Sequence, residues 1–316
     1  MNSTSRSMLA GALSLVAATF ISAAAFAQNP CPACGSQVQI KDIDKAIADA
    51  AQATGLVRST ANQIGQLNNY EYVGSGTMVD LEAKTLTKPV AVKRYTFNVM
   101  QQLWASRLDV VASNGARKIR VVKGDRAWDE TWVSEKADSG TIKKLKTAPA
   151  DAVAKLRGTM LWLQPHAFLS YMAFASGKKC MAPEVKACET KWSAAQENGK
   201  TAFTVEINGQ AYKGTLDDRK HIASVETKVT LPSGGGAKTI VAKYSGWRVG
   251  ESEGNDVANL AAYGPKSLDK FHNGLFYPGK VTYELDGVNV LDLQVTEGWN
   301  NPYTIYPEPE LLAKAQ

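Results

Sequence analysis

The sequence predicts an α+β protein, mainly β, in which a single curved antiparallel sheet forms an unclosed β-barrel wrapped around helices. Three observations predict this class. Most of the chain alternates apolar and polar residues with a period of two, many of these segments meet at hairpin turns, and apolar residues at helical spacing are confined to about 39–64 and 151–177. Strands and helices do not alternate regularly, so a parallel, doubly wound sheet is not expected.

Length and composition suit a globular domain of this kind. The chain has 316 residues, of which 44% are hydrophobic and 21% charged, so collagen, coiled-coil and wholly disordered classes are excluded. It carries 36 Lys and Arg against 30 Asp and Glu, a formal net charge of +6. The basic residues form no block, and no nucleic-acid partner is expected.

The first 27 residues resemble an export signal. Arg6 precedes an apolar stretch over 8–26 that ends in Ala25-Phe26-Ala27, the small-x-small pattern of a cleavage site. We therefore expect cleavage after Ala27, a periplasmic protein, and a mature chain of residues 28–316 that forms one domain. An uncleaved membrane anchor is the alternative. No later stretch approaches ~18 consecutive apolar residues, so no transmembrane segment is expected after cleavage.

Four cysteines accompany this signal: Cys31, Cys34, Cys180 and Cys188. An even number in an exported protein predicts two disulfides. Three pairings are possible and the sequence does not choose among them, although pairing each cysteine with its near neighbour has the lowest loop-closure cost. The Cys-x-x-Cys spacing of the first pair also occurs in thiol–disulfide enzymes, where it follows a strand; no strand is expected before it here.

The N-terminal half begins with the predicted helix over about 39–64, in which Ile43, Ile47 and Ala51 recur every four residues. Strand-like alternation starts at Tyr70. A long strand is expected over 93–111, with a bulge near Ala105 where the alternation changes phase.

Further strands over 118–123 and 126–133 are expected around a turn at Gly124-Asp125. The polar, lysine-rich stretch 134–148 predicts a solvated loop.

A second helical region follows. Asp151 is the expected N-cap, Pro165 interrupts the helix and Gly177 ends it. Because this region is apolar on nearly every side, it has to be covered. We therefore place it against the concave face of the sheet.

The C-terminal half is predicted to consist of hairpins. Asn208-Gly209 and Asp286-Gly287 are strong turn signals, and a bulge is expected between Val290 and Leu291. A polar stretch over about 256–273 has a helical tendency.

Five segments, in order along most of the mature chain, carry a family resemblance: YEYVGSG at 70–76, YTFNV at 95–99, GDRAW at 124–128, LWLQPHAFL at 161–169, and YPGK at 277–280 leading to Leu291-Asp292-Leu293. With the preceding helix, they resemble the LolA/LolB-like superfamily of periplasmic lipoprotein carriers. The likeness is greater to uncharacterised exported bacterial proteins of that fold. The resemblance implies an unclosed barrel around helices, with an apolar cavity that carrier members use for acyl chains.

Catalytic motifs are not evident. His166, His221 and His272 form no zinc-hydrolase spacing, and the chain has neither a nucleophile elbow nor a phosphate-binding loop. We therefore expect no enzymatic activity, no metal and no cofactor.

Large aromatic residues are either core or the lining of a pocket. The candidate ligand-binding residues are Trp104, Trp128, Trp132, Trp162, Phe168 and Tyr171. The leading hypothesis is an exported, non-catalytic protein that binds an apolar or amphipathic, lipid-like ligand. The alternatives are an accessory subunit of an exported enzyme or envelope complex with a filled cavity, and a thiol–disulfide enzyme. The sequence names neither the ligand nor the protein partner.

Overall fold

The computed structural model describes residues 38–58, 63–64, 69–100, 104–137, 140–177, 190–249 and 276–300. The predicted signal segment 1–27, the four cysteines, His272 and the stretch 256–273 lie outside these residues. The predictions made for them therefore remain predictions.

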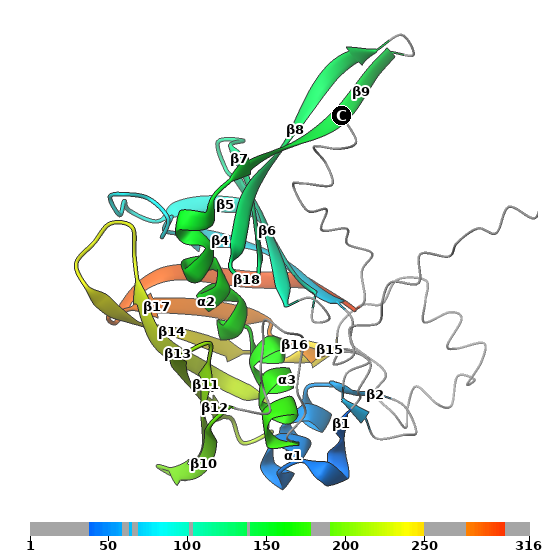
Figure 1. The fold of residues 1–316 in the computed structure, drawn as a ribbon, viewed down its shortest axis with the longest axis vertical. Coiled ribbons are helices and arrows are strands. Elements are labelled where there is room, and N and C mark those ends of the chain that lie inside the picture. The colour runs from blue at the N-terminus through cyan, green and yellow to red at the C-terminus, as the bar shows by residue number, and fades with distance from the viewer. Residues whose placement is uncertain are drawn as a thin grey trace, which may run out of the picture.

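One large antiparallel sheet of thirteen strands dominates the described chain (Figure 1). Along the chain its strands are β4 (Asn69–Met78), β5 (Val90–Met100), β6 (Ala105–Ala112), β7 (Arg117–Lys123), β8 (Arg126–Ala137), β9 (Gly140–Pro149), β10 (Trp192–Glu197), β11 (Lys200–Ile207), β12 (Gln210–Leu216), β13 (Ile222–Thr230), β14 (Ala237–Ser245), β17 (Lys280–Leu285) and β18 (Val288–Asn300). Their order is β10-β11-β12-β13-β14-β17-β18-β4-β5-β6-β7-β8-β9. The edge strands β9 and β10 do not pair with each other, which confirms an unclosed, mainly β fold.

Two small sheets complete the described strands. One joins β1 (Val38–Gln39), β2 (Val57–Arg58) and β3 (Gln63–Ile64), and the other joins β15 (Arg248–Val249) to β16 (Phe276–Tyr277).

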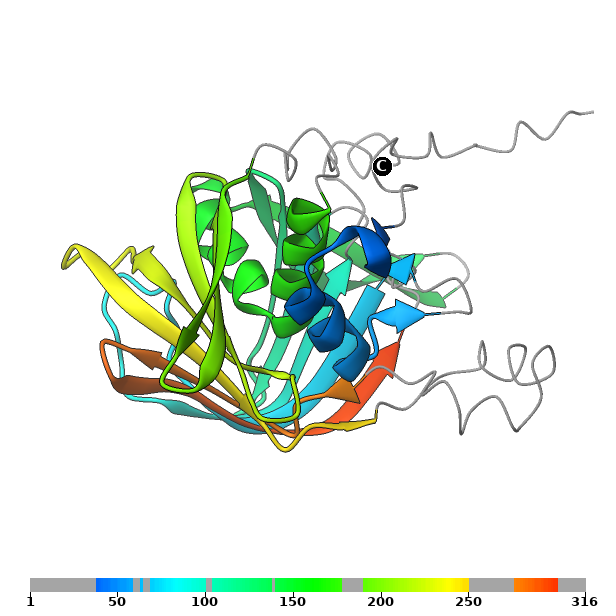
Figure 2. The same ribbon diagram turned by 90° about the horizontal axis from the view of Figure 1, so that it is seen from below.

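Three α-helices lie inside the curve of the large sheet (Figure 2). They are α1 (Lys45–Ala53), α2 (Ala154–Leu163) and α3 (Pro165–Ser176). Gln164 adopts an extended conformation between α2 and α3, and Pro165 occupies the first turn of α3, where its missing N–H costs nothing. α3 ends at Gly177, as predicted. The placement of apolar helices on the concave face is confirmed.

The start of α2 differs from the prediction. A 3₁₀ turn, Asp151–Val153, precedes the helix, and Val153 occupies its N-cap without a side-chain hydrogen bond. The Asp151 carboxylate instead accepts a hydrogen bond from the backbone N–H of Ala127 at 2.9 Å, so it attaches the helix entry to β8.

Both predicted hairpins are present, each with a two-residue turn at the predicted position. Ile207 pairs with Gln210, and Leu285 pairs with Val288. Asn208 and Gly209 have φ values of 51° and 74°, which a type I′ turn requires.

The β18 bulge is also confirmed. Tyr283 faces Leu291 and Glu284 faces Asn289, so Val290 is the extra residue. Val290 and Leu291 are both buried as a result.

The first predicted helix is much shorter than 39–64. It ends at Ala53, where Thr54 is the C-cap and Gly55 takes a left-handed conformation with a φ of 73°. The chain then enters the short strand Val57–Arg58. The apolar pattern in the sequence extends past the end of the helix because Leu56, which follows the helix, is also buried in the core.

The predicted long strand over 93–111 is two strands. The change of phase near Ala105 is the reversal between β5 and β6, in which Met100 pairs with Ala105 and Trp104 has a φ of 47°. A bulge and a reversal change the alternation in the same way. Because this turn contains no Gly, Pro, Asn or Asp, the sequence did not distinguish them.

The predicted loop over 134–148 is wrong. Residues 134–137 form the end of β8 and residues 140–148 form most of β9, and these two paired strands extend beyond the rest of the sheet (Figure 1). Ser134 and Lys146 are exposed, so the polar composition here belongs to regular structure at the surface.

Candidate functional site

Four of the six predicted aromatic residues lie in the core between the helices and the concave face. The ring centroids of Trp104 and Trp162 are 4.7 Å apart, and Tyr171 meets Trp162 edge-on at 5.3 Å. All three side chains are buried. Phe168 is completely buried under α3, against the backbone of Gly214 on β12.

The other two predicted residues lie elsewhere. Trp128 pairs with Val121, on the face of the sheet opposite α2, and packs there with Val121 and Met100. Its indole N–H donates to the Glu130 carboxylate at 3.4 Å. Trp132 lies farther along β8 and is 47% exposed. The structure therefore brings Trp104, Trp162 and Tyr171 into mutual contact, and separates Trp128 and Trp132 from them.

A cavity of about 70 Å³ lies between α2, the concave face and the connection from β4 to β5. Its walls come from all three: Met78, Val79, Leu81, Glu82, Tyr95, Phe97, Ser106, Leu108, Arg120, Val122, Leu156, Arg157, Met160, Tyr283, Val290 and Leu291. None of the six predicted aromatic residues is among them. The sequence did contain a local signal, since Leu156 and Met160 lie four residues apart on α2 and therefore share one helix face. The cross-strand row Phe97–Leu108–Arg120 required the strand pairing.

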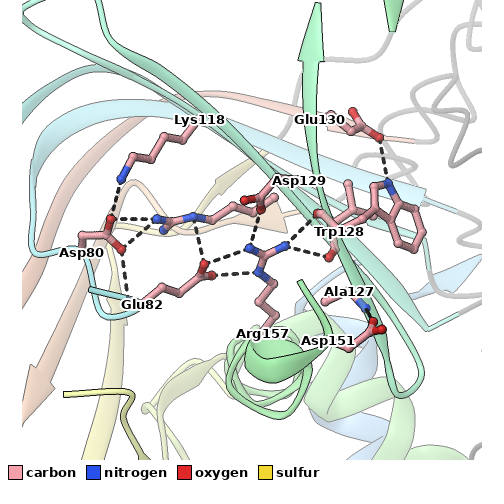
Figure 3. Close-up of polar contacts among 11 residues, drawn as sticks. Asp80, Glu82, Lys118, Ala127, Trp128, Asp129, Glu130, Asp151 and Arg157 are labelled. Atoms are coloured by element: carbon pink, nitrogen blue, oxygen red, sulfur yellow. Dashed lines mark hydrogen bonds and ion pairs between the residues drawn. The ribbon is translucent and has the colours of Figure 1, made fainter. Parts of the chain in front are cut away.

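Arg157 on α2 marks the polar rim of this cavity (Figure 3). Its Nε and Nη2 atoms each donate to one carboxylate oxygen of Glu82, both at 2.8 Å. Nη2 also donates to the Asp129 carboxylate at 2.5 Å. Its remaining donors reach the carbonyl oxygens of Val121 at 3.1 Å and Trp128 at 2.7 Å, so all five guanidinium N–H groups are used. Burial opposes the charge, but the hydrogen bonds to the two carboxylates outweigh it and raise the pKa of Arg157.

Arg120 extends this network along the rim. It contacts both carboxylate oxygens of Asp80 at 2.8 Å and lies 3.3 Å from Glu82. Lys118 also reaches Asp80, at 2.7 Å. Burial alone would raise the pKa of Asp80, but Arg120 and Lys118 hold it below its ordinary value.

Together with Arg157 and Asp129, the rim therefore has three cationic and three anionic side chains. It has no net charge.

Neutral hydroxyl groups lie deeper in the molecule. The buried Gln164 side chain accepts a hydrogen bond from the Tyr72 hydroxyl at 2.8 Å and donates to the Tyr283 hydroxyl at 2.5 Å. The Tyr244 hydroxyl donates to the Leu163 carbonyl at 2.6 Å. Burial raises the pKa of Tyr283 to about 12, so this hydroxyl stays neutral. These bonds attach the α2–α3 junction to the sheet.

Taken together, the cavity has mainly apolar walls, with Tyr95 and Tyr283 among them, and a charged but balanced rim. Such a site can bind an apolar chain with a polar end.

Two histidines lie in the core rather than at this cavity. His166 is buried, its Nε2 lies 2.7 Å from the carbonyl of Phe276, and burial lowers its pKa from 6.5 to about 4. His221 stacks on Trp247 with ring centroids 4.9 Å apart. In the part of the chain that the structure describes, no group of three or more His, Cys, Asp or Glu side chains could hold a metal ion.

A second hollow of about 540 Å³ is larger but has a different character. It lies over β11–β14, and its lining includes Lys155, Gln210, Lys213, Glu226 and Lys228. These charged and polar walls are poorly suited to an apolar ligand. We therefore take the smaller cavity as the candidate site.

Comparisons with known proteins give little further information. No protein-family model matches the chain, and no curated protein matches it significantly. Among solved structures, the lipoprotein LppX of Mycobacterium tuberculosis aligns over 83% of this chain and 98% of its own, with 11% identity and a TM-score of 0.28. These values are too low to assign the chain to a family. Across the described residues, no helix is both long and apolar enough to cross a membrane.

Proposed function

We propose that this protein is exported, is cleaved after Ala27 and binds a lipid-like amphiphile without transforming it. The observation that carries the proposal is the cavity under α2. Apolar groups from the helix, the sheet and the β4–β5 connection meet there beside Arg120, Arg157 and Glu82. An acyl chain would contact the apolar walls, while its polar end would remain at the charged rim.

The size of the cavity limits what it can hold without a change of shape. A volume of about 70 Å³ is below the roughly 150 Å³ of an engineered cavity that binds benzene. A longer chain therefore has to displace side chains of the wall. Met78, Leu81 and Met160 are only partly buried, and methionine adapts easily because its side chain is unbranched.

Thermal melting with a panel of fatty acids and lysophospholipids tests this proposal. A bound amphiphile should raise the melting temperature, because it stabilises the native state by about 2.7 kcal/mol at a hundredfold excess over Kd. Met160→Trp should fill the cavity and abolish the shift. Val288→Trp is the matched control, since Val288 is 66% exposed on the β17–β18 hairpin and does not line the cavity.

Two results would contradict the proposal. One is a melting temperature that no amphiphile changes. The other is an equal shift in the wild type and in Met160→Trp.

A second candidate is an accessory subunit of an exported enzyme or envelope complex. The feature that favours it is the filling of the concave side by α1–α3, with Trp104, Trp162 and Tyr171 packed on one another. This candidate predicts no amphiphile binding and a protein partner in purification from the native periplasm. A thiol–disulfide activity of Cys31 and Cys34 remains a third hypothesis, which an insulin-reduction assay tests.

A further inference from the structure

The distal part of the β8–β9 hairpin projects alone from the sheet (Figure 1). Pairing of β7 with β8 stops at Ile119 and Glu130, whereas β8 and β9 remain paired as far as Ala137 and Gly140. Residues 131–137 and 140–146 therefore form a two-stranded ribbon, here called the distal ribbon. A two-stranded hairpin is marginally stable by itself in water.

The distal ribbon exposes an aromatic residue. Trp132 is 47% exposed and pairs across the ribbon with the partly buried Leu145, so the two side chains occupy the same face. The neighbouring pairs, Thr131 with Lys146 and Val133 with Lys144, place both lysines on the opposite face.

Positive charge predominates along the same segment. Over 131–147 the sequence has four lysines, one glutamate and one aspartate, a net charge of +2. The lysines are Lys136, Lys143, Lys144 and Lys146. Lysine is depleted at protein–protein interfaces. At a membrane surface, in contrast, tryptophan concentrates at the headgroup level and lysine is attracted by anionic lipids.

We propose that the distal ribbon docks this protein on the surface of an anionic phospholipid bilayer. Trp132 and Leu145 contact the interfacial region from one face of the ribbon, and Lys144 and Lys146, on the other face, contact phosphates of the surrounding headgroups. An open sheet edge is not tolerated in the hydrocarbon core, so the ribbon lies among the headgroups and does not enter the hydrocarbon. This site is separate from the cavity under α2 and goes beyond the proposed ligand binding.

Vesicle flotation of the full mature chain tests the proposal. The protein should float with vesicles of phosphatidylcholine and phosphatidylglycerol but not with phosphatidylcholine alone, and added salt should weaken the binding. Trp132→Ser and the double variant Lys144→Glu/Lys146→Glu should each lower the partition coefficient by about tenfold or more. The double variant Lys200→Glu/Lys228→Glu is the charge-matched control on exposed strand positions elsewhere, and it should float like the wild type.

Three results would overturn the proposal: no flotation with anionic vesicles, equal flotation of the ribbon variants and the wild type, or equal losses in the control. Self-association without vesicles that depends on Trp132 would also overturn it, because the occupant would then be a second copy. Melting curves should show that the variants fold. Amphiphile binding should survive in Trp132→Ser, and flotation should survive in Met160→Trp, so failure of this proposal and failure of the proposed function are distinguishable.

Discussion

At the residue scale, Arg157 has the largest concentration of polar contacts at the candidate site. Its side chain is only 6% exposed, and its five donors connect α2 to Glu82, Asp129 and two carbonyl groups of β7 and β8. Among the described residues, removing Arg157 would leave Glu82 with Arg120 alone, at 3.3 Å, and would take a donor from the carbonyl oxygens of Val121 and Trp128.

We predict that Arg157→Leu lowers the free energy of unfolding by about 3–5 kcal/mol. Arg117→Leu is the control. Arg117 also pairs with an aspartate, Asp109, but its side chain is 49% exposed, so the loss should be about 0–1 kcal/mol. Urea denaturation measures both values. Equal losses would mean that the buried network contributes no more than an ordinary surface pair.

His166 makes stability depend on pH. Its pKa is about 4 in the folded protein against 6.5 for an ordinary histidine. Between these values the unfolded chain binds a proton that the folded chain does not. Stability is therefore complete above about pH 6.5 and falls as the pH drops towards 4, by about 3 kcal/mol in total.

His166→Gln should remove this part of the pH dependence, because an amide N–H can still donate to the Phe276 carbonyl but does not titrate. Urea denaturation at a series of pH values between 7 and 4 measures it. If the variant loses stability on acidification as steeply as the wild type, other groups are responsible.

At the element scale, two glycines test how closely the helices fit the sheet. A Cβ at Gly214 on β12 would lie 2.3 Å from Cε1 of Phe168 on α3, a distance that requires the buried ring to move. A Cβ at Gly158 on α2 would have no heavy atom within 4 Å outside its own stretch of helix. An added methyl group therefore clashes at Gly214 on β12 but has space at Gly158 on α2.

We predict that Gly214→Ala lowers the free energy of unfolding by about 1–3 kcal/mol, through overpacking. Gly158→Ala should instead raise it by about 0.5–1 kcal/mol, because alanine is the better helix former. Thermal melting distinguishes the two variants, because the first should melt at a lower temperature than the wild type and the second at a higher one. A neutral Gly214→Ala would show that α3 has room to shift away from β12.

At the scale of the whole molecule, the first and last strands of the large sheet along the chain pair with each other at its centre. β4 and β18 pair from Tyr70 with Asn300 to Met78 with Leu291, which joins strands more than 200 residues apart. The strands before and after α2 and α3 therefore belong to one sheet around one core. Such a structure should unfold as a unit.

Leu293→Ala tests this cooperativity. Leu293 is completely buried in the central pair, opposite Gly76, so its loss should cost about 2–5 kcal/mol. Tryptophan fluorescence and far-UV circular dichroism should shift to lower denaturant together. Val288→Ala, at an exposed position of the same strand, should shift neither. Separate transitions of the two signals would show that the halves of the sheet unfold independently.

The local chemistry of the sequence was sufficient to predict the fold class and the position of several turns, a helix break and a bulge. Asn208-Gly209 specifies its hairpin because both residues accept the left-handed conformations of the turn. Pro165 separates α2 from α3 because it cannot continue a preceding helix. Alternation identified the β18 bulge at Val290, since both neighbouring apolar side chains must be buried. Each of these results depends on residues close together in the chain.

Only the tertiary structure decided which residues form the candidate site. The large aromatic residues chosen from the sequence became core or surface, because burial depends on what packs over a strand: Trp128 and Trp132 lie on the same strand, yet only the first is covered. The cavity and the Arg157 network combine α2, β7, β8 and the β4–β5 connection, and the contact of Arg157 with Glu82 spans 75 positions. Alternation assigns a side chain to a face of its own strand, but strand order and helix placement determine which distant side chains meet it there.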